Sequence, residues 1–293
     1  MRRIAAGMAM VMFVAGSALA GYHFTSENRV ENEGQQPVTY TVEGWVDGDG
    51  ARIVFKGGTG PAGIPEGNYI VSSDGGKTLF LVDPKEHTYS RFDLEALMGA
   101  AGSIMHSLGG VMKMKIEDKN VEAKPPVDGG TMLGFPTRKY VFDTSYTLAM
   151  SVLGMKRRMR TKTHEEIWTT MALSDPGFGA WLSKKIQKTG YPELDELIAM
   201  AMHDIEGVTL KQATETITTD KKGKAQRSAQ TMTVTALEKA DVVPSMFEVP
   251  AGYSEKPWMA QGMPPQGAGS DGQQEEKEER PHGLGGLLKA IGG

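Results

Sequence analysis

The chain has 293 residues and no cysteine, and its 36 acidic residues outnumber 32 basic ones, for a formal net charge of −4. This balance argues against nucleic-acid binding, and the missing cysteines exclude disulfides, a thiol nucleophile and a lipid-modified N-terminal cysteine. A chain of this length can still bury a sizeable core.

Residues 1–20 predict a cleavable secretory signal. Arg2 and Arg3 precede an apolar run over 4–14, and Ala18-Leu19-Ala20 fits a cleavage site for small residues. The run is shorter than the roughly 20 apolar residues that span a bilayer, although an uncleaved anchor is the alternative. We therefore expect a periplasmic or secreted protein with no transmembrane segment after cleavage. Without Arg2 and Arg3, 30 basic and 36 acidic residues leave a net charge of −6.

The mature chain divides into three predicted parts: a flexible leader over 21–37, one β-rich domain over 38–254, and a disordered tail over 255–293. The tail is rich in Gly, Pro, Gln and Glu, and such a composition buries too little apolar surface to order itself. Its last residues space Leu and Ile as in one amphipathic turn, but many glycines weaken a helix there.

Period-2 alternation of apolar and polar residues predicts many strands within the domain. Tight hairpin turns are expected at 47–50, 74–77 and 220–223, and a long strand over 155–172. Residues 125–130 are expected to interrupt the strands because they are rich in Pro and Gly. On the last hairpin, the expected inward side chains are Met232, Val234 and Ala236.

Helical periodicity predicts two helical segments, over 93–108 and 177–203. Glycines weaken the first, and Gly190 and Pro192 break the second, so both need packing partners. The expected fold is mainly β: a strongly curved antiparallel sheet, or incomplete β-barrel, with the two helical segments on its concave face.

Four local motifs suggest a family. They are Gly134-Phe135-Pro136-Thr137-Arg138-Lys139-Tyr140, Glu166-Ile167-Trp168-Thr169-Thr170, Gly207-Val208-Thr209-Leu210 and Phe247-Glu248-Val249-Pro250-Ala251-Gly252-Tyr253. With these motifs the chain resembles an exported bacterial family of unknown function that is similar to the lipoprotein-carrier (LolA/LolB-like) fold. The resemblance covers about 38–253. It implies a curved barrel around a helical lid, with an apolar space that holds acyl chains.

No catalytic motif stands out. A Gly-x-Ser-x-Gly nucleophile motif is missing from the sequence. His164-Glu165-Glu166 begins like a zinc-protease helix, but Trp168 occupies the position of the second histidine. We therefore expect a protein that is not an enzyme and needs no cofactor or metal.

Methionines and other apolar residues of the predicted helices and the adjacent strand are the candidate lining of an apolar cavity, because Met suits adaptable apolar surfaces. The candidates are Leu94, Leu97, Met98, Met105, Met112, Met114, Trp181, Leu197 and Met202. Ordinary core packing is the alternative. Cu(I) binding is a third possibility, because Met112 and Met114 would share one face of a strand and thioethers favour that ion.

Basic residues alternate along the predicted strand over 155–172 and would share one sheet face: Lys156, Arg158, Arg160 and Lys162. They could form a solvated outer face, or dock an acidic envelope partner or anionic lipid headgroups. The sequence thus predicts a monomeric, non-enzymatic periplasmic protein that binds or carries an apolar ligand such as a lipid. The alternatives are an envelope interaction or stress protein with a basic docking face, and a Cu(I)-binding protein.

Overall fold

The computed structural model describes residues 19–58, 60, 64–93, 112–152, 155–173, 178, 195–197, 199–200 and 205–257. Its strands and one 3₁₀ helix are β1 (Leu19–Asn32), β2 (Val38–Asp47), β3 (Gly50–Lys56), β4 (Tyr69–Ser72), β5 (Thr78–Asp83), β6 (Thr88–Asp93), β7 (Met112–Met132), β8 (Phe135–Val152), β9 (Met155–Thr170), β10 (Val208–Asp220), β11 (Ala225–Val242), η2 (Pro244–Phe247) and β12 (Ser254–Glu255).

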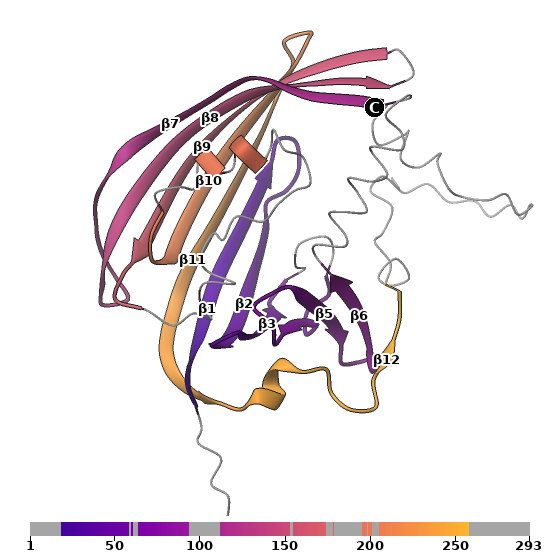
Figure 1. Cartoon of the computed structure of the whole chain (residues 1–293), viewed down its shortest axis with the longest axis vertical. Helices are drawn as coiled ribbons and strands as arrows, with labels where there is room; N and C mark the ends of the chain where they lie inside the picture. The colour runs from indigo at the N-terminus through magenta and orange to yellow at the C-terminus, as the bar shows by residue number, and fades with distance from the viewer. Residues whose placement is uncertain are drawn as a thin grey trace, which may run out of the picture. The chain divides into compact units, whose positions relative to one another are not determined.

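All described strands belong to one sheet, in the order β12-β6-β5-β4-β3-β2-β1-β11-β10-β9-β8-β7. Neighbours are antiparallel except β12, which runs parallel to β6. The long strands β7–β11 curve together, and the short helical pieces within 195–200 lie in the hollow of the curve (Figure 1). This concave side is called the inner face below. The prediction of a large, curved, mainly antiparallel sheet is confirmed.

The predicted flexible leader is wrong, because residues 19–32 form β1 in the middle of the sheet. β1 pairs with β2 on one side and with β11 on the other. Phe24 is buried in the core, and the amide of Asn28 donates a hydrogen bond to the hydroxyl of Ser26 on the same face. These two buried polar residues break the apolar alternation that would have indicated a strand.

The prediction of two helical segments is not confirmed. The first lies over 93–108, and residues 94–111 are outside the described residues. In the second, the described helical residues are Phe178, 195–197 and 199–200. Within the described part of the chain, no helix is long and apolar enough to cross a membrane.

β-Bulges account for two local corrections. The expected interruption at 125–130 does not end the strand: β7 continues through it, with shifts in its pairing to β8 between Lys124 and Val127 and between Asp128 and Gly130. In β11, the pairing to β1 shifts so that Thr235 is an extra residue. Because one extra residue reverses the alternation, Val234 is buried but Ala236 is exposed.

The C-terminal segment crosses from the centre of the sheet to its edge. After β11, η2 buries Phe247, and the chain then covers the outer face of β3–β6, where Val249 and Tyr253 pack against a buried apolar cluster. The backbone N–H of Lys256 donates to the carbonyl of Tyr89 at 2.8 Å. The ordered domain therefore continues beyond 254, so the predicted start of the tail at 255 is too early. Residues 258–293 lie outside the described residues.

Candidate functional site

The inner face is filled with apolar side chains around β1–β3 and the start of β10. Phe24, Leu210 and Val234 are almost completely buried there, together with Phe178. Phe178 belongs to the chain between β9 and β10, which is called the covering segment below. The ring of Phe178 lies 4.7 Å from that of Tyr22, centroid to centroid. This half of the inner face is a packed core.

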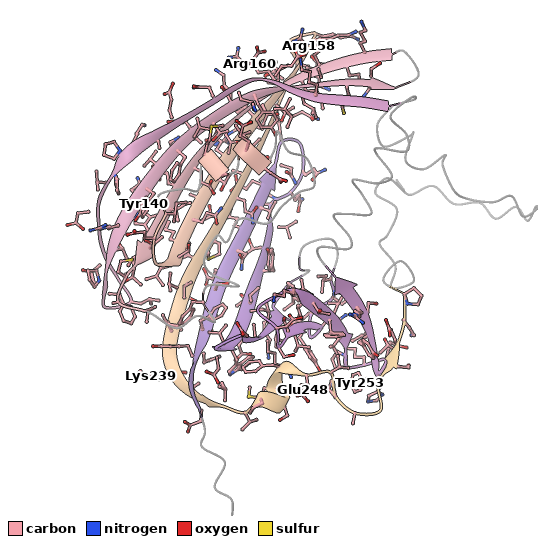
Figure 2. The ribbon with its side chains drawn as sticks, in the orientation of Figure 1. Tyr140, Arg158, Arg160, Lys239, Glu248 and Tyr253 are labelled. Carbon is pink, nitrogen blue, oxygen red and sulfur yellow. The ribbon has the colours of Figure 1, made fainter. Side chains whose placement is uncertain are left out.

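A row of apolar side chains continues along β8 beyond that core. Tyr140 and Phe142 stack with parallel rings 6.5 Å apart and are buried against Ile167. The next inward positions are Thr144, Tyr146, Leu148 and Met150, all partly exposed. Figure 2 labels Tyr140, which lies on the curved wall. The apolar members are called the β8 row (Tyr140, Phe142, Tyr146, Leu148 and Met150). Its last three residues offer apolar surface that the described residues do not fully cover.

A strip of polar side chains on β9 and β10 lies beside the β8 row. The Gln212 amide donates to Glu165 Oε1 at 2.6 Å, and the Thr214 hydroxyl donates to the same oxygen at 3.3 Å. The hydroxyls of Thr163 and Thr216 lie 3.3 Å apart. In the pairing of β9 with β10, Gln212, Thr214 and Thr216 lie opposite Ile167, Glu165 and Thr163. Because Ile167 is buried on the inner face and these positions alternate along each strand, all of them face inward. The wall therefore combines an apolar row with hydroxyl and amide groups.

Glu196 links the covering segment to the wall, because its carboxylate forms an ion pair with Lys119 of β7. Lys119 lies at a bulge of β7, beside Asp118, whose φ is 53°. Leu197, the next residue along the segment, is buried with 3% of its surface exposed. Leu197 is thus a buried contact of the covering segment.

The outer face of β7–β9 carries a network of opposite charges. His164 Nδ1 lies 2.7 Å from Asp143 Oδ1, and Lys124 approaches the other oxygen at 3.5 Å. The hydrogen bond from His164 lowers the pKa of the Asp143 carboxyl, against the opposing effect of partial burial. Lys139 lies 2.7 Å from Glu166 and lowers the pKa of that carboxyl in the same way. The charges here neutralise one another.

His164-Glu165-Glu166 lies on β9, so these residues are not part of a zinc-protease helix. Among the described residues, no group of three or more His, Asp or Glu side chains is arranged to hold a metal ion.

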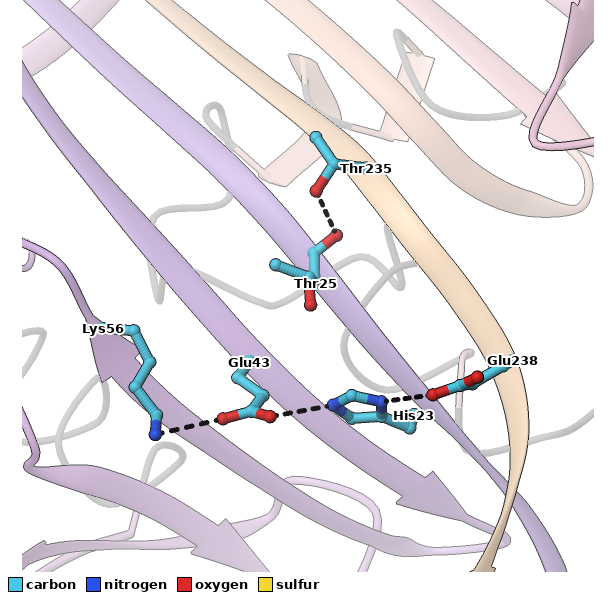
Figure 3. Close-up of polar contacts among 6 residues, drawn as sticks. All are labelled: His23, Thr25, Glu43, Lys56, Thr235 and Glu238. Carbon is cyan, nitrogen blue, oxygen red and sulfur yellow. Dashed lines mark hydrogen bonds and ion pairs between the residues drawn. The ribbon is translucent and has the colours of Figure 1, made fainter.

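A second polar chain crosses the outer face at β1 (Figure 3). His23 Nε2 lies 3.0 Å from Glu43 and Nδ1 lies 3.1 Å from Glu238, while Lys56 approaches Glu43 at 3.2 Å. Burial raises the pKa of the Glu43 carboxyl, but the hydrogen bonds from Lys56 and His23 outweigh it, so the pKa lies below its usual value. The ring of His23 also stacks on that of Trp45. His23 thus links β1 to both of its neighbouring strands and stabilises the sheet.

The predicted docking residues Lys156, Arg158, Arg160 and Lys162 are exposed and lie on the outer face of β9. Figure 2 labels Arg158 and Arg160 near the end of the sheet farthest from Lys239. Arg158 forms an ion pair with Glu117, which Lys115 also approaches at 3.7 Å. The alternation thus brings these cations to one face, as expected, but their docking role stays a prediction.

Most predicted cavity residues cannot be placed in this site. Six lie outside the described residues: Leu94, Leu97, Met98, Met105, Trp181 and Met202. Met112 and Met114 start β7, but their side chains are outside the description, so Cu(I) binding stays a prediction. The sequence analysis did not predict the β8 row, although Tyr146, Leu148 and Met150 alternate with polar and small residues.

Comparisons with known proteins give no family. No family model matches the chain, and no curated protein does. Among solved structures, a LolA superfamily protein from Nitrosomonas europaea is similar over 78% of this chain and 90% of that one, with 9% identity and a TM-score of 0.28. A structure of PNGF-II is similar over 82% of this chain and 32% of its own, with 13% identity and a TM-score of 0.32. Both TM-scores are low, so function must be inferred from this chain's own residues.

Proposed function

We propose that the protein is a non-enzymatic, exported binding protein whose inner face takes an apolar or amphipathic ligand such as a lipid acyl chain. The observation that carries the proposal is the β8 row, which extends apolar surface past the packed core. The partly exposed part of the row, from Tyr146 to Met150, is about 14 Å long at the usual rise per residue of a strand. That length accommodates part of an extended acyl chain.

The polar strip beside the row supports a ligand with two kinds of surface. Glu165, Gln212 and Thr214 already satisfy one another, and the hydroxyls of Thr163 and Thr216 add further hydrogen-bonding capacity. An apolar body would lie along β8 while polar groups of the same ligand face β9 and β10. Binding sites that are mostly apolar with a few polar groups are typical for small molecules.

Fluorescence titration of the purified protein with a dansyl-labelled fatty acid tests this proposal. The double substitution Leu148→Ser and Met150→Ser is expected to raise the Kd at least tenfold, because each truncation removes apolar contact with the ligand. The matched control is Val141→Ser with Ala149→Ser, which changes outward-facing residues of the same strand. The proposal is wrong if the protein does not bind the probe, or if both double variants lose affinity equally.

A further inference from the structure

One end of the sheet has an unusual construction. Pairing between β9 and β10 stops at Met159 and Asp220, so residues 155–158 of β9 pair with β8 alone. The start of β7, the end of β8 and the start of β9 thus form a three-stranded ribbon, with the turn between β10 and β11 beside its base (Figure 1). We call residues 115–117, 147–151, 156–160 and 220–224 the cationic end.

The cationic end carries eight basic residues and two acidic ones, a net charge of +6 in a chain whose formal net charge is −4. The basic residues are all exposed: Lys115, Lys156, Arg157, Arg158, Arg160, Lys221, Lys222 and Lys224. Glu117 is shared by Arg158 and Lys115, and the Asp220 carboxylate accepts hydrogen bonds from backbone N–H groups of its own turn. The two acidic residues thus leave most of the positive charge of the cationic end without a counter-charge.

Farther along the same strands, two cations meet acids: Lys124 meets Asp143, and Lys139 meets Glu166. At the cationic end only Lys115 and Arg158 do so, and they share Glu117. The other six basic residues there are exposed and have no ion pair with a described acid. Like charges in such a group repel one another, and this cost is relieved when the group meets an anionic surface.

Apolar side chains accompany these charges. Met150 and Met159 are partly exposed on the inner face of the ribbon, where Arg157 pairs across from Met150. Met150 and Ala149 also help to line a shallow depression of about 320 Å³, whose charged residues are Lys115, Glu117, Lys156, Arg157 and Arg158. Long basic side chains over apolar groups suit a boundary between water and lipid.

We propose that the cationic end binds the surface of an anionic phospholipid membrane. The cations come from two strands, β7 and β9, and from the β10–β11 turn at a projecting end of the sheet, so they suit a broad surface of negative charge. This binding goes beyond the proposed uptake of a ligand on the inner face and uses different charged groups.

Sedimentation of the full chain with vesicles tests the proposal. The vesicles are phosphatidylcholine alone, or phosphatidylcholine with about one third phosphatidylglycerol. Removing three cations is expected to weaken binding to the anionic vesicles at least tenfold, since each basic residue near such a surface contributes roughly fivefold at low salt. The test variant is Lys156→Gln, Lys221→Gln, Lys222→Gln, and the control is Lys77→Gln, Lys85→Gln, Lys239→Gln, with the same change of charge at exposed sites elsewhere.

The expected result is binding of the unchanged protein and the control to anionic vesicles, weakened by added salt, with little binding to neutral ones. Circular dichroism should show that both variants stay folded, and both should still bind the dansyl fatty acid. No binding to anionic vesicles, equal binding to neutral ones, or equal losses in the two variants would each overturn the proposal. In those cases an acidic protein becomes the partner to seek.

Discussion

Replacing Gly44 by Ala should destabilise the protein because of one close cross-strand contact. Gly44 of β2 lies directly opposite Phe24 of β1. A Cβ at Gly44 would lie 3.0 Å or less from three atoms of the Phe24 ring. The ring cannot swing into solvent, because Phe24 is only 2% exposed.

Two opposing effects set the magnitude. Ala restricts the unfolded backbone and on that account would stabilise a strand by about 0.5–1 kcal/mol over Gly. Forcing an extra methyl into a filled core costs about 1–3 kcal/mol. The second effect is larger here, so we expect a net loss of about 1–2 kcal/mol in the free energy of unfolding.

Urea denaturation followed by circular dichroism measures this loss, and a double-mutant cycle assigns its cause. Phe24→Leu alone should destabilise the protein, because it leaves space over Gly44. In that background Gly44→Ala should cost much less, which gives a coupling of about 1 kcal/mol. A stabilising Gly44→Ala, or effects that add within about 0.5 kcal/mol, would refute the role of the ring.

Two further predictions concern acid and the N-terminus. Asp143, Glu166 and Glu43 have pKa values below those of the unfolded chain. Their contribution to the free energy of unfolding should therefore be fully present above about pH 5 and be lost as the pH falls below about 4. Urea midpoints measured from pH 7 to 3 should show this fall, and Glu166→Gln should make it shallower. Mass spectrometry of the protein expressed in a bacterium should give a mature chain that begins at or near Gly21, and a chain that keeps Met1 would contradict the predicted signal cleavage.

Sequence patterns predict this sheet well where one face is uniformly apolar. β2 is an example, since Tyr40 and Val42 are both buried as their alternation indicates. The hairpin around Asp220 is another, because its turn residues and flanking alternation agree. β9 was predicted almost to its bounds.

Tertiary context explains what the patterns missed. β1 buries Ser26 and Asn28, which hydrogen-bond to each other, and only the formed sheet buries these polar residues. The bulge at Thr235 reverses the face of Ala236, and no local signal marks that extra residue. The β8 row was within reach of sequence reasoning, whereas the concentration of charge at the cationic end depends on pairing that brings β7, β9 and the β10–β11 turn together.

The place of β1 has a consequence for how the chain reaches this fold. Its partner β11 is about two hundred residues away, with Leu19 opposite Val242, so the centre of the sheet closes only after nearly the whole domain has been synthesised. Contacts this distant in sequence slow folding, and until then one edge of β1 is free to pair with other chains. Ser26 and Asn28 interrupt the apolar side chains Tyr22, Phe24 and Val30 on the inner face of β1. The polar character that hides β1 from pattern recognition would therefore also limit aggregation while the strand waits for its partner.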